Sequence, residues 1–282
     1  MFCFHCKNQV TLKTYQGVFL NLTPKLKLEL KTTHPSVYDQ YQLENSPDKR
    51  EISRKDCPWG IAIPNMLNTN FYVWIEALKA YETGVKQLKL KPVEEVYFYG
   101  KDNAYYHLYL LGALKEKNIR NRHFIKNFLT TNSGIKISSS KPETMVLASE
   151  TGFKPEVLRY FMAKNDTSNK DRTFTNELLV QAQKEYHSIL NIEKRINGFV
   201  KINKRKLRET TSLFLDYVAI NDAFFDADYG KVVTILKENY DSLAAKLSSF
   251  FEKKADFDLA RIKKTYLVLA VYLKLIVGLR KI

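Results

Sequence analysis

The segment Phe98-Tyr-Gly-Lys-Asp-Asn-Ala-Tyr-Tyr-His107 carries side chains suited to holding a nucleotide. Gly100 has no Cβ, so its backbone can approach a ligand closely. Lys101 supplies a cation and Asp102 a hydrogen-bond acceptor. A helix beginning near Asn103 would add unpaired amide groups at its positive end. The alternative is an ordinary strand-to-helix turn with a solvated Lys101–Asp102 pair, and the segment by itself does not separate the two interpretations.

Two cysteines near the start, Cys3 and Cys6, have the spacing of one arm of a zinc site. A tetrahedral zinc site needs four ligands. His5 lies too close to both cysteines to complete the site well, and the third cysteine, Cys57, is far along the chain. We therefore expect a metal-free remnant of a zinc knuckle, with bound Zn²⁺ as the alternative.

The chain is basic, with a formal net charge of +15 and a pI of about 9.5. Such a field favours polyanions, either nucleic acid, an anionic membrane surface or an acidic protein, with a solvated basic surface as the alternative. The run from 201 to 208 poses the same choice between a solvated inter-helix turn and a phosphate-binding patch. In the second case the RNA-binding residues are Lys204, Arg205, Lys206 and Arg208.

Cysteine content and hydropathy limit the possible compartments. Three cysteines do not form a disulfide framework in 282 residues, which indicates a reducing compartment. The N-terminus lacks the pattern of a signal peptide, and the apolar run 266–279 is too short to span a bilayer and contains Lys274. We expect a soluble, cytoplasmic protein without a membrane partner.

The pattern of apolar residues divides the chain into three parts. The first 56 residues look irregular. Between 57 and about 168, predicted strands (71–75, 93–99 and 127–131) alternate with predicted helices (76–88 and 103–117), which indicates an α/β fold with a parallel sheet. After 171 the apolar residues recur every three or four positions, which predicts a bundle of helices near 175–200, 207–227, 232–250 and 262–276.

Five segments in a fixed order resemble the methionyl-tRNA synthetases, a family of class I aminoacyl-tRNA synthetases. The segment 98–107 is similar to the family's F-x-G-K-D-[NI]-x-x-[FY]-H. The other four are Cys57-Pro-Trp-Gly-Ile-Ala-Ile-Pro64, Phe71-Tyr-Val-Trp-Ile-Glu-Ala-Leu-Lys-Ala-Tyr81, Gly134-Ile-Lys-Ile-Ser-Ser-Ser140 and Thr151-Gly-Phe-Lys-Pro-Glu-Val-Leu-Arg-Tyr160. The resemblance runs from the first residues to about residue 180 and fades in the helical tail.

The resemblance implies an architecture. Residues 1–56 would be a remnant connective insertion with a zinc knuckle. Residues 57–168 would be the second half of a Rossmann-type catalytic domain, a doubly wound parallel sheet, with a signature loop at 136–140. Residues 169–282 would be a helical bundle resembling an anticodon-binding domain. Such a half-sheet has an open edge, so we expect one of three situations: a separate N-terminal half covers it, the chain is part of a longer enzyme that covers it, or a docking protein does so.

The resemblance also implies roles for individual residues. Trp74 and His107 would line a methionine pocket, and Gly100, Lys101, Asp102 and Asn103 would hold ATP or the adenylate, with Mg²⁺. Catalysis would involve Lys136, Ser138 and Ser140, because the loop would face the triphosphate while charge develops on pyrophosphate. Without the resemblance, Trp74 would be taken for a core aromatic and His107 for an ordinary helix histidine.

Several departures from the family leave the activity open. The chain contains no H-x-G-H motif and no E-P-W-like element, Ser139 stands where the family has a second lysine, and Glu76 replaces an aspartate. One hypothesis is the C-terminal part of a methionyl-tRNA synthetase, which activates methionine with ATP and transfers it to tRNA when the missing half is supplied. The alternative is a catalytically inactive, synthetase-derived protein that binds tRNA, rRNA or a ribonucleoprotein.

Overall fold

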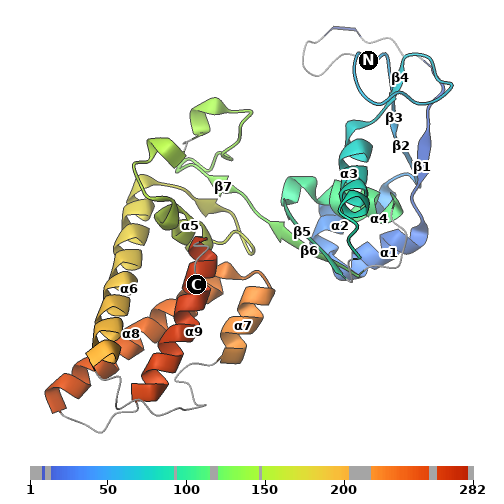
Figure 1. The fold of residues 1–282 in the computed structure, drawn as a ribbon. Helices are drawn as coiled ribbons and strands as arrows, with labels where there is room; N and C mark the ends of the chain where they lie inside the picture. Colours follow the sequence, from blue (N-terminus) through green and yellow to red (C-terminus); the bar gives the residue numbers. More distant parts are fainter. Residues whose placement is uncertain are drawn as a thin grey trace. The chain divides into compact units, whose positions relative to one another are not determined.

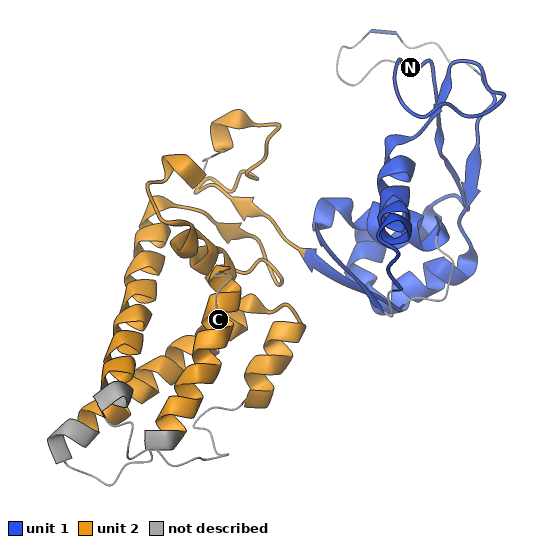
Figure 2. Cartoon of the chain, in the orientation of Figure 1, with its two compact units in different colours: residues 1–125 blue, residues 126–282 orange. Residues whose placement is uncertain are grey.

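The computed structural model describes residues 8–9, 14–91, 94–114, 120–145, 148–202, 217–253 and 259–278 (Figure 1). The chain divides into two compact units, Met1–Ile125 and Lys126–Ile282 (Figure 2). This division falls inside the segment 57–168 that the sequence predicts to be one half-domain.

Unit 1 combines short strands with helices. Strand β1 (Phe19–Asn21) pairs antiparallel with β2 (Lys49–Glu51), and β3 (Ser53–Lys55) pairs antiparallel with β4 (Thr69–Phe71). Strand β5 (Glu94–Gly100) lies beside β6 (Arg120–Lys126). The helices are α1 (Pro24–Thr33), α2 (Pro35–Gln40), α3 (Val73–Gln87), the π-helical η3 (Tyr105–Leu110) and α4 (Leu111–Leu114), with 3₁₀ turns η1 (Leu43–Asn45) and η2 (Lys101–Asn103).

The prediction of a strand at 71–75 is wrong. Strand β4 ends at Phe71, and α3 begins at Val73. Val, Trp and Ile favour strands in general. Ile75 and Leu78 are nevertheless both buried, and side chains three positions apart lie on the same face in a helix but on opposite faces in a strand. The predicted strand 93–99 is confirmed as β5. Of the helix predicted at 103–117, residues 105–114 form η3 and α4, and residues 115–117 lie outside the described residues.

The first 56 residues are more regular than the sequence suggests. Thr23 caps α1 by accepting a hydrogen bond from the amide of Leu26 at 3.3 Å, and Pro24 occupies the first helical position. A Thr-Pro pair before an apolar pattern is a helix-start signal. Leu30, Val37 and Tyr38 are buried in the core of unit 1, so these helices are part of its packing.

The doubly wound sheet is not seen among the described strands, which form two-stranded sheets. Strand β5 shows why. Tyr97 and Tyr99 are 8% exposed and face the core, whereas Val96 and Phe98 are 45% and 54% exposed. Alternation of this kind is typical of a sheet with one solvent-exposed face. An interior strand of a doubly wound sheet is instead covered by helices on both faces. Phe98 stacks on Phe124 of β6, with ring centroids 4.9 Å apart.

Unit 2 is mainly helical. Strands β7 (Leu129–Thr130) and β8 (Arg172–Thr173) pair in parallel, so the strand predicted at 127–131 is shorter than expected. The 3₁₀ turns are η4 (Pro142–Thr144) and η5 (Ala148–Glu150). The helices are α5 (Pro155–Lys164), α6 (Asn176–Ile202), α7 (Tyr217–Phe225), α8 (Tyr229–Lys253) and α9 (Leu259–Val277). No helix in the described ranges is long and apolar enough to cross a bilayer.

The predicted apolar stripes form the core of the bundle, as expected from their spacing. On α8, the positions at three- and four-residue intervals are at most 1% exposed, namely Val232, Leu236, Tyr240, Leu243 and Leu247. On α9, Ile262, Tyr266, Leu269 and Leu273 are buried in the same cluster. Burial of this continuous face stabilises the bundle through the removal of apolar surface from water.

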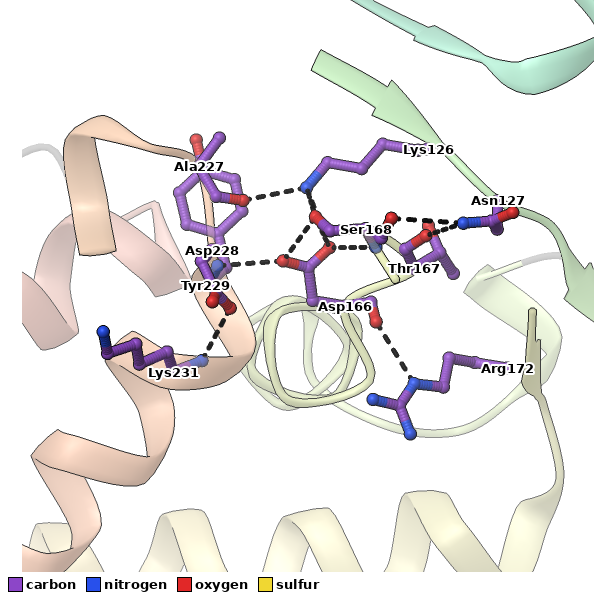
Figure 3. Close-up of polar contacts among 10 residues, drawn as sticks. All are labelled: Lys126, Asn127, Asp166, Thr167, Ser168, Arg172, Ala227, Asp228, Tyr229 and Lys231. Carbon is purple, nitrogen blue, oxygen red and sulfur yellow. Dashed lines mark hydrogen bonds and ion pairs between the residues drawn. The ribbon is translucent and has the colours of Figure 1, made fainter. Parts of the chain in front are cut away.

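A buried carboxylate joins three distant segments of unit 2 (Figure 3). Asp166, just after α5, forms an ion pair with Lys126 at 2.8 Å and accepts hydrogen bonds from Ser168 and from the amide of Tyr229. Lys126 also donates to Ser168 and to the carbonyl of Ala227. The Asp166 side chain is 7% exposed and that of Lys126 21%. We call these five residues the Asp166 cluster.

The bundle contains a glutamate that should make its stability depend on pH. Glu193 accepts a hydrogen bond from the Tyr240 hydroxyl at 2.7 Å, and burial raises the pKa of its carboxyl group. Between the unfolded pKa, about 4.3, and the raised folded pKa, the folded state binds more protons, so the free energy of unfolding falls as pH rises through this window.

We therefore expect Glu193→Gln to gain stability relative to the parent chain as pH rises from about 4 to 7. Glutamine keeps the acceptor for Tyr240 and cannot ionise. Urea midpoints measured at both pH values test this. Glu238→Gln, at an exposed position of α8, controls for the loss of one negative charge. An equal response of the two variants to pH would contradict the role of burial.

Candidate functional site

His107 sits at the centre of an aromatic cluster in unit 1 and is 6% exposed. Its Nδ1 lies 3.1 Å from the carbonyl oxygen of Asn103, and its Nε2 lies 3.0 Å from the Tyr81 hydroxyl. Because a carbonyl can only accept, Nδ1 carries a proton and donates it to Asn103, while Nε2 forms a hydrogen bond with the Tyr81 hydroxyl. The ring stacks on Tyr99 at 4.3 Å. Two hydrogen bonds and a stacked ring therefore fix the imidazole.

Trp74 lies in the first turn of α3 and belongs to the same cluster. Its indole stacks on Tyr106, with centroids 4.0 Å apart and ring planes 4° apart, and meets His107 edge-on at 6.0 Å. A hydrogen bond with the Tyr72 hydroxyl raises the pKa of Tyr106 to about 12. Trp74 and His107, which the sequence assigns to one pocket, are brought together by α3 and η3.

The turn predicted to hold a nucleotide connects β5 to η3. Gly100 has φ −71° and ψ 151°, an extended conformation open to any residue, so the backbone geometry does not require glycine here. The Tyr41 hydroxyl is within hydrogen-bond distance of the carbonyl oxygens of Lys101 and Asp102, at 3.0 and 3.1 Å. Tyr41, at the end of α2, thus fixes the backbone of the 100–103 turn. The carbonyl of Asn103, in the same turn, fixes the His107 ring.

Sequence reasoning missed Tyr41, because it lies in a part of the chain that was expected to be irregular. It also missed the role of Glu76. The Oε1 atom of Glu76 accepts a hydrogen bond from the amide of Ile61 at 3.0 Å. The side chain that replaces the family's aspartate therefore holds the 57–64 segment against α3.

The signature loop lies in unit 2, whereas the aromatic cluster lies in unit 1. The Lys136 ammonium is 4.0 Å from the centroid of the Phe128 ring, a cation–π contact. The amide of Ser138 donates to Thr144 at 3.1 Å, and the hydroxyls of Ser138 and Ser140 are 3.0 Å apart. Ser139 is exposed. These hydrogen bonds give the loop a defined, folded shape.

Two predicted groups fall outside the described residues. These are Cys3 and Cys6 of the expected knuckle, and the basic residues Lys204, Arg205, Lys206 and Arg208. Across the part of the chain that is described, no three or more His, Cys, Asp or Glu side chains gather where they could hold a metal ion. Cys57 instead lies 3.1 Å from the carbonyl oxygen of Trp59 and can donate its thiol hydrogen to it.

Comparison with known proteins identifies relatives. Residues 11–196 match the family model described as tRNA synthetases class I (M). The chain is similar to a methionine–tRNA ligase from Herminiimonas arsenicoxydans, at 26% identity over 264 residues, and to one from Polaromonas sp., at 27% over 249 residues. These alignments cover 79% and 76% of this chain but 37% and 35% of the relatives. The chain thus spans little more than a third of their length.

Solved structures agree on the fold. Mycobacterium tuberculosis methionyl-tRNA synthetase in complex with methionyl-adenylate matches with a TM-score of 0.68 at 18% identity, over 98% of this chain and 62% of that one. The apo form of the same enzyme matches with a TM-score of 0.63, again over 98% of this chain and 61% of that one. At 18% identity, the similarity to these structures shows a shared fold and nothing more.

Proposed function

The chain belongs to the class I tRNA synthetases (M), the methionyl-tRNA synthetase family, and on this premise we propose that it supplies the methionine- and adenylate-binding part of such an enzyme. An N-terminal half, supplied either by a longer form of this chain or by a separate polypeptide, would complete the site. ATP with Mg²⁺ would then activate methionine for transfer to tRNA. The observation that supports this proposal best is the stack of Trp74 on Tyr106 beside His107, next to the 100–103 turn.

The aromatic cluster suits a thioether side chain. Sulfur makes favourable contacts with aromatic rings, and a flat indole offers a wide apolar face. His107 is held by Asn103 and Tyr81 before any ligand arrives, so little side-chain freedom is lost on binding. A pocket that is already ordered can select a ligand by shape.

The 136–140 loop would act on the phosphates, and the 100–103 turn would hold the adenylate. Lys136 would oppose the charge that develops on pyrophosphate as the methionine carboxylate attacks the α-phosphorus. Mg²⁺ is held mostly by substrate phosphates and waters, and needs only one or two protein carboxylates. Asp102, exposed at the turn, is the carboxylate that this segment provides.

The alternative function is binding of RNA without catalysis. Ser139 in place of a lysine removes an oriented cation from the signature loop, which could cost a few kcal/mol of transition-state stabilisation. The sequence also lacks H-x-G-H, and its net charge of +15 favours a polyanionic partner. In this case the partner would be tRNA, rRNA or a ribonucleoprotein.

Methionine-dependent pyrophosphate exchange separates the two functions. The chain would be assayed alone and together with a candidate N-terminal half that carries H-x-G-H. Exchange by the pair supports the enzymatic proposal and rules out the inactive alternative. No exchange in either sample, together with RNA binding that weakens as salt is raised, supports the alternative.

We expect Ser139→Lys to raise the exchange rate of the reconstituted pair several-fold. The position is exposed, so a longer side chain meets no steric barrier, and the new cation can approach the phosphates. Ser139→Gln has a side chain of comparable length without the charge and serves as the control. An equal rate for both variants would mean that the loop is not directed at the phosphates during the reaction.

A further inference from the structure

Unit 1 contains a cavity of about 340 Å³ that is separate from the contacts around His107. It lies where β2, the end of α2 and the start of η3 meet. Its lining residues are Leu22, Tyr41, Ser46, Pro47, Lys49, Arg50, Tyr105 and Tyr106. This volume is at the lower end of the range for small-molecule pockets. We call it the Arg50 pocket.

The Arg50 pocket contains two cations, Lys49 and Arg50. Among the described residues, neither Lys49 nor Arg50 forms an ion pair. The Nε atom of Arg50 is buried and has no hydrogen-bond partner in the part of the chain that the structure describes. A guanidinium that is partly desolvated without an acceptor is costly. An anion bound to this guanidinium would offset the cost. The guanidinium carries a delocalised positive charge and binds phosphate or carboxylate groups in preference to other acceptors.

Aromatic rings form another wall of the pocket. The Arg50 guanidinium lies 5.7 Å from the centroid of Tyr105, and the Tyr105 ring lies 5.5 Å from those of Tyr41 and Tyr106. Burial raises the pKa of Tyr41 and of Tyr105, and the hydrogen bond with Tyr72 raises that of Tyr106. All three phenols are therefore neutral at neutral pH and do not repel an anion.

We propose that the Arg50 pocket binds one unpaired nucleotide of an RNA, with the base against the tyrosines and the phosphate on Arg50 and Lys49. Alternating cations and aromatic rings are typical of surfaces that bind single-stranded nucleic acid, because every base can stack and every nucleotide carries a phosphate. The inference rests on the proposed function in so far as RNA is the partner. Of the residues that would make this contact, Tyr41, Lys49 and Arg50 lie outside the family's motifs, and Tyr105 and Tyr106 lie within the segment 98–107.

The pocket borders the turn proposed to hold the adenylate. Tyr41 lines the pocket, and its hydroxyl also bonds the carbonyls of Lys101 and Asp102. A nucleotide stacked on Tyr41 would therefore lie beside this turn. The same chemistry could come from a free mononucleotide, and the experiment must distinguish that source from RNA.

The test measures the affinity of the full chain for an unstructured RNA tetranucleotide by fluorescence anisotropy over a range of salt. Arg50→Gln should weaken binding about 10-fold and reduce the salt slope by about 0.7, the value for one phosphate contact on a single strand. Tyr105→Leu should weaken binding by roughly 5- to 150-fold through lost stacking, with little change in the slope.

Matched controls separate these effects from general changes in charge and packing. Arg122→Gln removes the same charge from a guanidinium that also lies over a ring, 5.0 Å from Phe124, but does not line the pocket. Tyr15→Leu removes an exposed tyrosine of the same unit that is not part of the pocket. Both should bind the tetranucleotide as the parent chain does, and circular dichroism would confirm that all variants fold.

The outcomes are distinct. Loss of affinity in the Arg50 and Tyr105 variants, with both controls unchanged, supports the proposal. If AMP binds as tightly as the tetranucleotide and competes with it, the occupant is a free nucleotide and the RNA assignment is overturned. If the chain binds RNA and all four variants are equal, this pocket is rejected while the proposed function stands. If the parent chain binds no RNA, the inference and the RNA partner of the proposed function both fail, and pyrophosphate exchange decides about catalysis separately.

Discussion

Replacing Asp166 with alanine is expected to lower the free energy of unfolding of the helical unit by about 3–5 kcal/mol. Removal of the carboxylate leaves the Lys126 ammonium without its partner in a site where it is 21% exposed. The amide of Tyr229 and the hydroxyl of Ser168 also lose an acceptor. Each uncompensated buried donor adds to the penalty. Urea unfolding followed by far-UV circular dichroism measures the change.

An exposed ion pair of the same unit provides the matched control. Asp241 pairs with Lys237 at 2.6 Å on α8, and both side chains are about half exposed. Asp241→Ala should cost less than about 1 kcal/mol, because water screens this pair and solvates the remaining ammonium. If Asp166→Ala and Asp241→Ala cost the same, burial is not what makes the Asp166 cluster strong. Adding Lys126→Met to Asp166→Ala should restore part of the stability, because it removes the unpaired charge.

The second large effect concerns methionine. Trp74→Ala is expected to raise the KM for methionine by roughly 10- to 150-fold in the pyrophosphate exchange of the reconstituted pair, which corresponds to loss of the contacts of one large apolar side chain. The indole stacked on Tyr106 at 4.0 Å is the flat apolar surface of the cluster. Its removal also takes away the T-shaped ring contact with His107 at 6.0 Å.

Trp74→Phe should recover much of the affinity, because an aromatic face remains. Binding can also be followed without catalysis. The chain has two tryptophans, so Trp59→Phe leaves Trp74 as the sole indole, and methionine should change its fluorescence on titration. An unchanged KM in Trp74→Ala, together with no fluorescence response, would remove Trp74 from the methionine pocket.

Local periodicity predicted the bundle well and the α/β part less well. The stripes Val232–Leu247 and Ile262–Leu273 form a core because side chains three and four apart lie on one face of any helix. The strand predicted at 71–75 became the start of α3, since a short apolar run has no period long enough to separate strand from helix. The Thr23-Pro24 pair is a helix-start signal within the part of the chain that was expected to be irregular.

The motifs predict that Trp74 and His107 lie near each other, and their ring centroids are 6.0 Å apart. The residues that hold the candidate site in place could not be predicted in this way. Tyr41 acts on a turn 60 residues away, and Glu76 on an amide 15 residues away. Contacts of this length depend on how elements pack, which no local pattern records. The same holds for the Arg50 pocket, whose two cations lie at least 55 positions from Tyr105 and Tyr106 in the sequence.

The Asp166 cluster also has a consequence for the order in which unit 2 assembles. Its contacts join residues that are 40, 63 and 101 positions apart. Forming each contact closes a long loop, so the chain loses conformational entropy before the contact can stabilise the fold. The helices around it can form from contacts between near neighbours. The ion pair should therefore form after the folding transition state, and its loss should speed unfolding far more than it slows refolding. The Lys126–Asp166 ion pair is therefore expected to act mainly on the unfolding rate of the helical unit.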